Sequence, residues 1–433
     1  MKFWDPKIET MRPKEMEKLQ FKRLKKSVKA VYRNVPHYKR KFDEVGIKPD
    51  DVRSISDISK LPYTTKADFA ESYPYGLFAV PMDEIVRIHS SSGTTGKPKV
   101  VGYTKNDIET WGNLLARNFT MVGLSRKDIF QNSVNYGLFT GGLGIHTGIE
   151  TLGATAVPAG TGSTLRQLEM MADFGVTALH CTPSYALYLA ETAVENNLVG
   201  QLKLKTGCFG AEPWSENMRK TIEEMFEIKA YDCYGLSEMI GPGIAFECTC
   251  QDGMHIWDDH FLAEVLDENG DQVSEGEKGE LVLTSLTKEG LINIRYRTGD
   301  ITRLLEPECE CGRCSTRVSR MMGRVDDMII VRGVNVFPTQ IQDVISKIPE
   351  VTNQFCIVLT RNAKNLDEMT VQVELEKDAF TDDIMEIEKI QQRVIDELMN
   401  VLNIRTGVTL LEFGSIERTG GKAKRIIDNR TIL

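Results

Sequence analysis

The chain has 433 residues, of which 41% are hydrophobic and 27% are charged, and it carries a formal net charge of −9 with a pI near 5.4. This length predicts two or more domains, and the composition is typical of a folded, enzyme-like protein and excludes a disordered or fibrous chain. The negative charge argues against nucleic acid as a partner. The sequence shows neither a signal-type amino terminus nor an apolar run long enough for a bilayer. We therefore expect no membrane partner and a cytoplasmic protein whose nine cysteines stay reduced.

The first predicted element is a helix over residues 14–32, where apolar residues recur at helical spacing among lysines and arginines. Pro36 lies just beyond the end of this pattern. The basic face of such a helix could bind a membrane or nucleic acid. Because the whole chain is acidic, we interpret that face as solvated surface.

A polar loop follows at residues 90–99, with three serines, two threonines, two glycines and two lysines in ten residues. Hydroxyl and amide groups can donate hydrogen bonds to phosphate oxygens, glycines let the backbone approach closely, and lysines add positive charge. The pattern therefore indicates a polyphosphate site, although a flexible linker has a similar composition and the ending of the Walker motif is missing. Residues 100–103 predict a strand, so we expect the loop to join two strands.

Short β-branched runs then alternate with helical patterns, which predicts a parallel sheet covered by helices on both faces. The predicted strands are residues 129–134, 154–158, 176–181, 204–209 and 228–233, and the predicted helices are 165–174, 184–194 and 216–226. Polar segments follow four of these strands, at residues 135–137, 182–184, 210–213 and 234–238. Because ligands bind at the carboxyl ends of strands in such folds, we expect a pocket there.

From Phe261 the pattern changes to strand after strand, which indicates a strand-rich subdomain of about residues 246–322 that we expect to be antiparallel and barrel-like. Its strands are predicted at 261–266, 279–284, 292–296 and 301–305. A charged segment at 324–327 precedes an α+β module with helices at 339–348 and 382–402. We therefore divide the chain into domains 1–325 and 326–433.

Six soft or borderline metal ligands occur in two short stretches that flank the strand-rich subdomain. Four of them would complete a tetrahedral, structural zinc site. Our choice is Cys248, His255, Cys309 and Cys311, with Cys250 and Cys314 as substitutes. The other cysteines lie in apolar strand patterns, which indicates core positions.

Five separated motifs carry a family resemblance. They are Ser90–Lys99, Tyr234-Gly235-Leu236-Ser237-Glu238, Tyr296-Arg297-Thr298-Gly299-Asp300, Gly323-Arg324-Val325-Asp326-Asp327 and Gly420-Gly421-Lys422-Ala423. In this order the chain resembles the adenylate-forming superfamily of acyl-CoA synthetases. The runs at 136–142 and 332–338 are similar to those of phenylacetate-CoA ligases. Many relatives lack a cysteine cluster, so the resemblance does not imply zinc.

The resemblance implies an α/β fold with a large amino-terminal domain and a small, mobile α+β carboxy-terminal domain. It implies that the carboxylate of an aryl acid, phenylacetate or a related arylacetate, attacks the α-phosphate of ATP, with magnesium present. Coenzyme A then displaces AMP. A homodimer and a place in phenylacetate catabolism are further implications. Two alternatives stay open: an enzyme that transfers AMP or acyl groups to another acceptor such as a deazaflavin cofactor, and a non-catalytic nucleotide-binding protein.

The resemblance also implies roles for single residues. Lys422 contacts the carboxylate of the acid substrate and the bridging phosphate oxygen. Glu238 binds magnesium, and Asp326 is the hinge between the two domains. The ATP-binding set is Ser91, Ser92, Gly93, Thr94, Thr95, Lys97, Gly210, Ala211, Glu212, Pro213, Asp232, Tyr234, Gly235, Asp300 and Arg324. Without the motifs, the same lysine, acids and arginine would be interpreted as surface, turn or salt-bridge residues.

The acid itself is expected at an aromatic, glycine-lined segment. Its candidate residues are Tyr136, Phe139, Gly141 and Gly142. A flat ring suits aromatic neighbours, and glycines leave space beside them. Core packing is the alternative explanation for the aromatic side chains.

Overall fold

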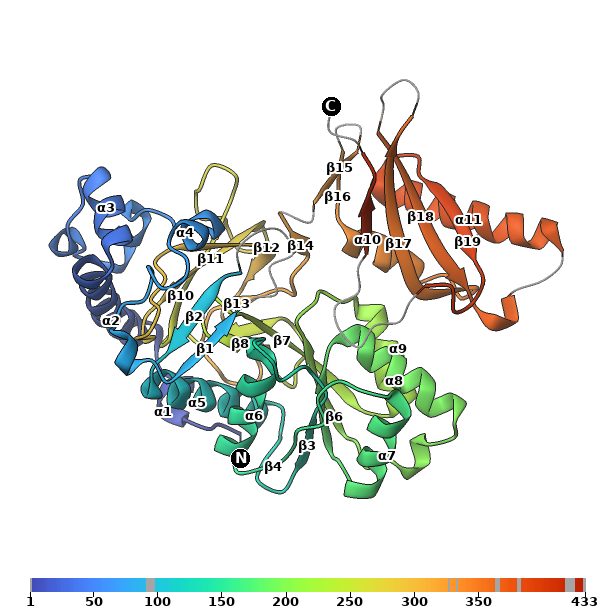
Figure 1. Cartoon of the computed structure of the whole chain (residues 1–433), viewed down its shortest axis with the longest axis horizontal. Helices are drawn as coiled ribbons and strands as arrows, with labels where there is room; N and C mark the ends of the chain where they lie inside the picture. Colours follow the sequence, from blue (N-terminus) through green and yellow to red (C-terminus); the bar gives the residue numbers. More distant parts are fainter. Residues whose placement is uncertain are drawn as a thin grey trace.

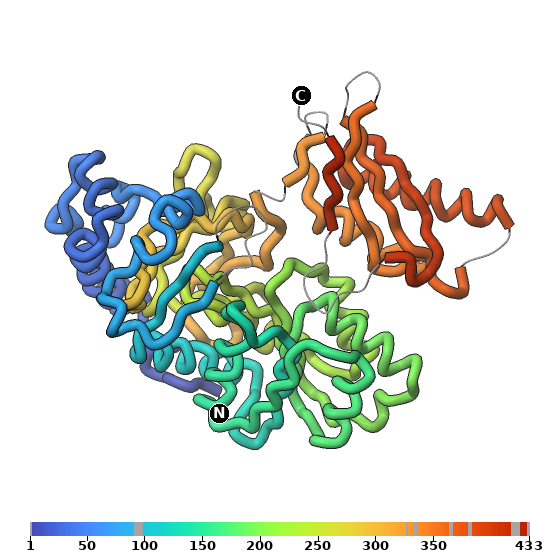
Figure 2. The backbone as a smooth tube through the Cα atoms, in the orientation of Figure 1, coloured from blue at the N-terminus to red at the C-terminus, as the bar shows by residue number. Residues whose placement is uncertain are grey.

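The computed structural model describes residues 2–90, 98–325, 328–331, 334–362, 367–379, 383–416 and 425–430. Figure 1 shows a large body built from the amino-terminal three quarters of the chain and a smaller body, orange to red, that holds the carboxy-terminal elements. The backbone trace in Figure 2 shows the same division.

The amino-terminal helices cover one end of the large body. They are α1 (Pro6–Glu9), α2 (Pro13–Asn34), α3 (Pro36–Glu44) and α4 (Lys66–Glu71). Helix α2 confirms the helix predicted over 14–32, and it begins with a proline at its first turn, where no backbone donor is needed. Its buried side chains include Leu24, Val28 and Val31, which share one face at helical spacing. Most of its basic residues are exposed, whereas Arg23 is half-buried and pairs with Asp259.

The large sheet has twelve strands, and the strands at one end of it run parallel. The hydrogen-bonded order is β10-β11-β12-β13-β9-β8-β7-β6-β5-β3-β4, with β14 beside β12. The parallel strands are β3 (Ile129–Asn132), β4 (Thr155–Val157), β5 (Ala178–Cys181), β6 (Thr206–Gly210) and β7 (Lys229–Leu236). These confirm the five predicted strands, with ends that differ by a few residues.

Helices cover both faces of the parallel strands, as predicted. They are α5 (Lys105–Met121), α6 (Thr140–Leu152), α7 (Thr164–Phe174), α8 (Pro183–Glu195) and α9 (Glu216–Phe226). Neighbouring strand residues enter different cores: Cys208 packs in the core of α5 and α6, whereas Phe209 packs in the core of α7, α8 and α9. Because side chains alternate along a strand, each face of the sheet has its own helical layer. Figure 1 shows the two layers on opposite sides of β3 and β6.

The strand-rich part is antiparallel, as predicted, and it continues directly from the parallel strands. Its strands are β8 (Gly241–Glu247), β9 (Met254–Ile256), β10 (Phe261–Leu266), β11 (Lys278–Ser285), β12 (Tyr296–Leu305), β13 (Arg317–Val318) and β14 (Gly323–Arg324). The strand predicted at 301–305 is confirmed as part of β12, which spans 296–305, whereas the separate strand at 292–296 and the break after it are wrong. Gly299 takes φ +77° within it, beside a register shift on β11, so the polar residues that suggested a turn lie inside a bulged strand.

The smaller body has its own core. It consists of β15 (Ile329–Val331), β16 (Val334–Val336), α10 (Pro338–Ile345), β17 (Val351–Arg361), β18 (Asp367–Leu375), α11 (Ile384–Leu402), β19 (Gly407–Leu411) and β20 (Ile426–Asp428). Its four-stranded sheet has the order β19-β18-β17-β20, and α10 and α11 pack on it. Gln342 and Ser346 of this body meet Met218 and Asn217 of α9. Across the described ranges, no helix is both long and apolar enough to cross a membrane.

Candidate functional site

Two antiparallel strands bracket the polar loop. β1 (Arg87–Ser90) ends where the loop begins, and β2 (Val100–Tyr103) follows it, so the loop joins two strands as predicted. Several predicted site residues lie outside the described residues: Ser91, Ser92, Gly93, Thr94, Thr95, Lys97, Asp326 and Lys422. The remaining predicted residues can be placed.

Glu238 lies just beyond β7, buried to 5% exposure. Its carboxylate accepts a hydrogen bond from Tyr296 Oη at 2.9 Å and forms an ion pair with Lys99 Nζ. Burial alone would raise the pKa of Glu238, but the Lys99 ammonium outweighs burial and the pKa is lowered. The carboxylate is therefore ionised and can serve a hard cation. Sequence reasoning missed this pairing, because the two residues are 139 positions apart.

Three predicted nucleotide residues from three motifs meet at one point. Tyr234 Oη donates to Asp300 Oδ2 at 2.7 Å, and the Arg324 guanidinium pairs with Asp300 Oδ1. Strands β12 and β14 place Asp300 directly opposite Arg324, and Arg324 Nη2 also donates to Thr298 O at 3.0 Å. Burial and the neighbouring Asp300 raise the pKa of Tyr234 well above its ordinary value, so its hydroxyl stays a donor.

The predicted adenine turn follows β6. Gly210 admits no side chain, because a Cβ there would lie 2.0 Å from Cys233 O on the next strand. Ala211 takes φ +74°, in the left-handed region that side chains rarely adopt. Glu212 Oε1 accepts from Ser184 N at 2.7 Å, which ties the turn to the first turn of α8, and Pro213 follows. The turn is thus fixed by backbone and capping contacts, with its backbone groups at the carboxyl edge of the sheet.

Asp232 and Gly235 lie on β7, beside this turn. Burial, followed by the charge of Glu247, raises the pKa of Asp232 to about 7. Its backbone N–H donates to Glu247 Oε2 at 2.7 Å, and Glu247 also pairs with Arg219 at 2.5 Å. Gly235 is required by packing, because a Cβ would lie 2.1 Å from Gly241 O on β8.

The aromatic segment precedes α6. Tyr136 Oη accepts from Asn132 Nδ2 at 2.8 Å and lies 3.3 Å from His146 Nδ1. We expected the two glycines to leave space for a ligand ring, but the chain itself fills it. A Cβ on Gly141 would lie 2.3 Å from the Phe139 ring, and one on Gly142 would lie 2.4 Å from Asn135 O. The glycines let the segment fold back onto its own helix.

This segment is hydrogen-bonded to two predicted motifs. Leu138 O accepts from Ser90 N at 3.0 Å and contacts His89 Nδ1 at 3.0 Å, so the segment is fixed to the strand that enters the polar loop. Thr140 Oγ1 and Ser237 Oγ lie 2.9 Å apart, which joins it to the segment that carries Glu238. The acid-side and phosphate-side candidates therefore form one connected edge.

The four predicted zinc ligands lie together. Their ligand atoms are all within 4.8 Å of one another, with Cys248 Sγ 3.6 Å from Cys309 Sγ and Cys311 Sγ 3.4 Å from His255 Nε2. Hydrogen bonding between the two thiols lowers the pKa of Cys311 and raises that of Cys248. The substitutes, Cys250 and Cys314, are outside the cluster, and Cys314 is exposed.

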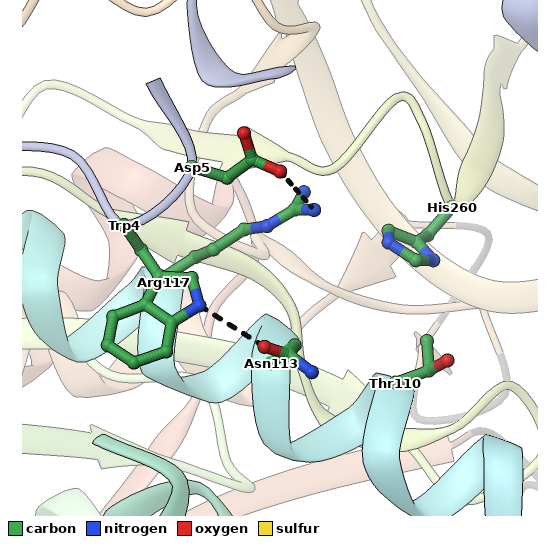
Figure 3. Close-up of a pocket in the computed structure, with 6 residues that line it drawn as sticks. All are labelled: Trp4, Asp5, Thr110, Asn113, Arg117 and His260. Carbon is green, nitrogen blue, oxygen red and sulfur yellow. Dashed lines mark hydrogen bonds and ion pairs between the residues drawn. The ribbon is translucent and has the colours of Figure 1, made fainter. Parts of the chain in front are cut away.

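A separate cavity of about 220 Å³ lies under the amino-terminal segment (Figure 3). Its lining residues are Trp4, Asp5, Thr110, Asn113, Arg117 and His260. Trp4 Nε1 donates to Asn113 Oδ1 at 3.2 Å, and Arg117 pairs with Asp259 at 2.8 Å. None of the predicted site residues that the structure describes lines this cavity, so we assign it no ligand.

Comparison with known proteins identifies the family. The sequence pattern of AMP-binding enzymes matches residues 25–287, and that of the AMP-binding enzyme C-terminal domain matches residues 333–430. The phenylacetate-coenzyme A ligase of Escherichia coli is 46% identical over 99% of this chain and 98% of its own length. The phenylacetate-coenzyme A ligase of Thermus thermophilus is 42% identical, with 99% of both chains covered.

Solved structures agree with this assignment. A crystal structure of 2-hydroxyisobutyryl-CoA ligase in the postadenylation state, in complex with 2-HIB-AMP, has a TM-score of 0.93 at 30% identity. That comparison covers 99% of this chain and 93% of the ligase. The same ligase with CoA in the thioesterification state has a TM-score of 0.73 at 31% identity, with the same shares covered. The chain therefore belongs to the AMP-binding enzyme family and, within it, to the phenylacetate-coenzyme A ligases.

Proposed function

We propose that this protein ligates an aryl acid, phenylacetate or a related arylacetate, to coenzyme A through an acyl-adenylate, with release of AMP and pyrophosphate. The observation that carries the proposal is the meeting of Tyr234, Asp300 and Arg324, with Glu238 on the same sheet edge. These residues come from separate family motifs, and the near full-length similarity to phenylacetate-coenzyme A ligases supports the acid and the acceptor.

In the adenylation step, the contacts of each candidate residue suit the role that we assign to it. The Asp300 carboxylate accepts from the ribose hydroxyls, and Arg324, bound to Asp300, lies beside the sugar and its phosphate. Tyr234 fixes Asp300, and the turn Gly210–Pro213, with Asp232 and Gly235 beside it, receives the adenine. Glu238 would hold magnesium, which supplies positive charge to the phosphates when bound.

The charge of the reacting groups explains the remaining assignments. A carboxylate approaches a polyphosphate, so positive charge must neutralise both the nucleophile and the departing pyrophosphate. We assign this task to Lys422 for the carboxylate and to residues 91–97 for the β- and γ-phosphates. Tyr136 and Phe139 are proposed to border the aryl group, on the edge that Leu138 connects to β1, while Gly141 and Gly142 let this segment fold back onto its helix.

The second half-reaction needs the carboxy-terminal unit to move, so that Lys422 leaves and a thiol enters. We propose domains 1–325 and 326–433 with a hinge at Asp326. The two TM-scores, 0.93 and 0.73 against two states of one ligase, support a unit that changes its position. Asp326→Pro should keep acyl-adenylate formation measurable and stop thioester formation. Equal loss of both would overturn the hinge.

A homodimer is part of the proposal by family resemblance.

We also propose a structural zinc ion at Cys248, His255, Cys309 and Cys311. Zinc–sulfur bonds of about 2.3 Å in a tetrahedron place sulfur atoms roughly 3.8 Å apart, close to the spacing of the Cys248–Cys309 pair. Ser315 Oγ lies 3.0 Å from His255 Nδ1, so the ring is oriented with Nε2 toward the thiols. Four protein ligands leave no open position, which suits a structural site.

The test of the proposed function is a panel of aryl and alkyl acids, assayed for AMP formation with and without coenzyme A. We expect AMP release that requires both an arylacetate and coenzyme A. Release without coenzyme A would favour another acceptor, and no pyrophosphate release with any acid would favour a non-catalytic nucleotide-binding protein.

A further inference from the structure

The hairpin β1–β2 presents nitrogen-bearing side chains on one face. Arg87 and His89 are two residues apart on β1, so they point to the same side, and Arg87 lies opposite Tyr103 in the register. The Tyr103 ring stacks on Trp111 with centroids 5.1 Å apart, and the His89 ring meets both edge-on. The packed rings fix the direction in which this face points.

A turn after β11 brings a lysine to the same rings. Lys288 Nζ lies 4.3 Å from the centroid of the Tyr103 ring. The turn is anchored because the Asp107 carboxylate accepts from Glu289 N at 2.7 Å and from Gly290 N at 2.8 Å. The lysine is therefore held over the rings by its own backbone, and its position does not depend on an ion pair.

Three nitrogen atoms in this group have no hydrogen-bond partner within the described ranges: Arg87 Nη1, His89 Nε2 and Lys288 Nζ. Lys288 is 4% exposed and His89 is 1% exposed. Burial of unpaired donors is costly, most of all when they are charged, so such groups usually have partners. Burial lowers the pKa of Lys288 to about 8, against the opposing effect of Asp107 and Glu238.

The acids nearby are already engaged. Asp107 accepts from the two backbone groups of the turn, and Glu238 is bound by Lys99 and Tyr296. Two cations, Arg87 and Lys288, thus share one face with unused donors, which is the composition of an anion site, whereas His89 donates Nδ1–H to Leu138 O and keeps only an acceptor at Nε2. Two positive charges suit a polyanion better than a single carboxylate. β1 ends at Ser90, where the segment proposed to bind the phosphates begins in the sequence.

We propose that Arg87 and Lys288 form an anion subsite that receives inorganic pyrophosphate as it leaves the adenylation. The inference rests on the proposed function. In that reaction a carboxylate oxygen bonds to the α-phosphorus, the bond to the bridging oxygen breaks, and pyrophosphate departs with the electron pair. The subsite supplies donors to that departing group.

The first experiment measures inhibition of acyl-adenylate formation by added pyrophosphate in Lys288→Met and in Arg87→Gln. Met keeps the length of the side chain over Tyr103 and removes the charge. Loss of one charged hydrogen bond should raise the inhibition constant of pyrophosphate roughly tenfold in each variant. Inhibition by AMP should keep its native value, because AMP does not enter the subsite.

The matched control is Lys105→Met, which removes an exposed lysine at the start of α5 and should leave pyrophosphate inhibition unchanged. Native inhibition constants in both test variants would overturn the proposal. Arg87 is only half-buried, so its variant tests the subsite even if the Lys288 variant unfolds.

The second experiment is a calorimetric titration of the nucleotide-free native protein and of Arg87→Gln with pyrophosphate. Weaker binding to Arg87→Gln supports the subsite, and equal binding or none to either protein overturns it. This titration does not depend on catalysis. Absence of AMP formation by the native chain would overturn the proposed function, whereas unchanged pyrophosphate binding in the variant would overturn the subsite alone.

Discussion

The nucleotide edge and the cysteine cluster are both assembled from distant segments, but different contacts hold them. At the nucleotide edge, Glu238 and Asp300 are carboxylates paired with the protein's own cations, Lys99 and Arg324. In the cluster, the ligand atoms contact one another, a backbone N–H group and the Ser315 hydroxyl, and none of these contacts is an ion pair. The ion pairs at the nucleotide edge can be exchanged for contacts with a bound substrate. The four converging side chains of the cluster are instead arranged to surround one metal ion. Substitutions at the edge should therefore change kinetics, and substitutions in the cluster should change stability.

The largest effect is expected from Lys422→Ala. Loss of one charge that stabilises the transition state typically costs about 10²–10³ in rate, so adenylation should fall by that factor. Thioester formation from supplied acyl-adenylate should continue, because Lys422 acts only in the adenylation half-reaction. Separate assays of the two half-reactions measure this difference, and unchanged adenylation would show that another lysine serves the carboxylate.

Cys311→Ser should have the next largest effect, on stability. Loss of one ligand should release the metal and leave buried donors and acceptors unsatisfied, each costing roughly 1–3 kcal/mol. Elemental analysis and thermal unfolding should show no stoichiometric zinc and a lower melting temperature, with the KM for ATP unchanged. Cys314→Ser is the matched control, because Cys314 is exposed and outside the cluster. Equal metal content in the two variants would contradict the assignment.

Tyr234→Phe should have a smaller effect, confined to the nucleotide. The change removes the 2.7 Å hydrogen bond to Asp300 and keeps the ring. A net hydrogen bond contributes about 0.5–1.5 kcal/mol, so the KM for ATP should rise roughly two- to tenfold while the KM for coenzyme A stays the same. Tyr188→Phe on α8 is the control. If the KM for ATP did not change, the Tyr234 hydroxyl would serve folding alone.

The sequence predicted the parallel strands, the helices over them and the grouping of Cys248, His255, Cys309 and Cys311, because periodicity and the spacing of cysteines are visible along the chain. It placed a strand break wrongly at 297–300, because the bulge at Gly299 depends on the register with β11. Partners such as Lys99 for Glu238 were not predictable, since no local pattern encodes a contact across 139 residues. The glycines at 141 and 142 suggested open space, and only the folded chain shows that Phe139 and Asn135 occupy it.

The smallest expected effect concerns pH and tests whether the adenine side of the edge contributes charge to stability. The pKa of Asp232 is raised from 3.8 to about 7, so the folded state binds a proton more tightly than the unfolded state does. Stability from this group is therefore present below about pH 4 and is lost as pH rises toward 7. Asp232→Asn, which is neutral at every pH, should match the native melting temperature at pH 4 and exceed it by about 1–2 °C at pH 8. Thermal unfolding at the two values measures the difference. A variant less stable than the native protein at pH 8 would mean that the ionised carboxylate is stabilising, and Asp232 would then belong with Glu238 and Asp300 among the paired acids of the edge.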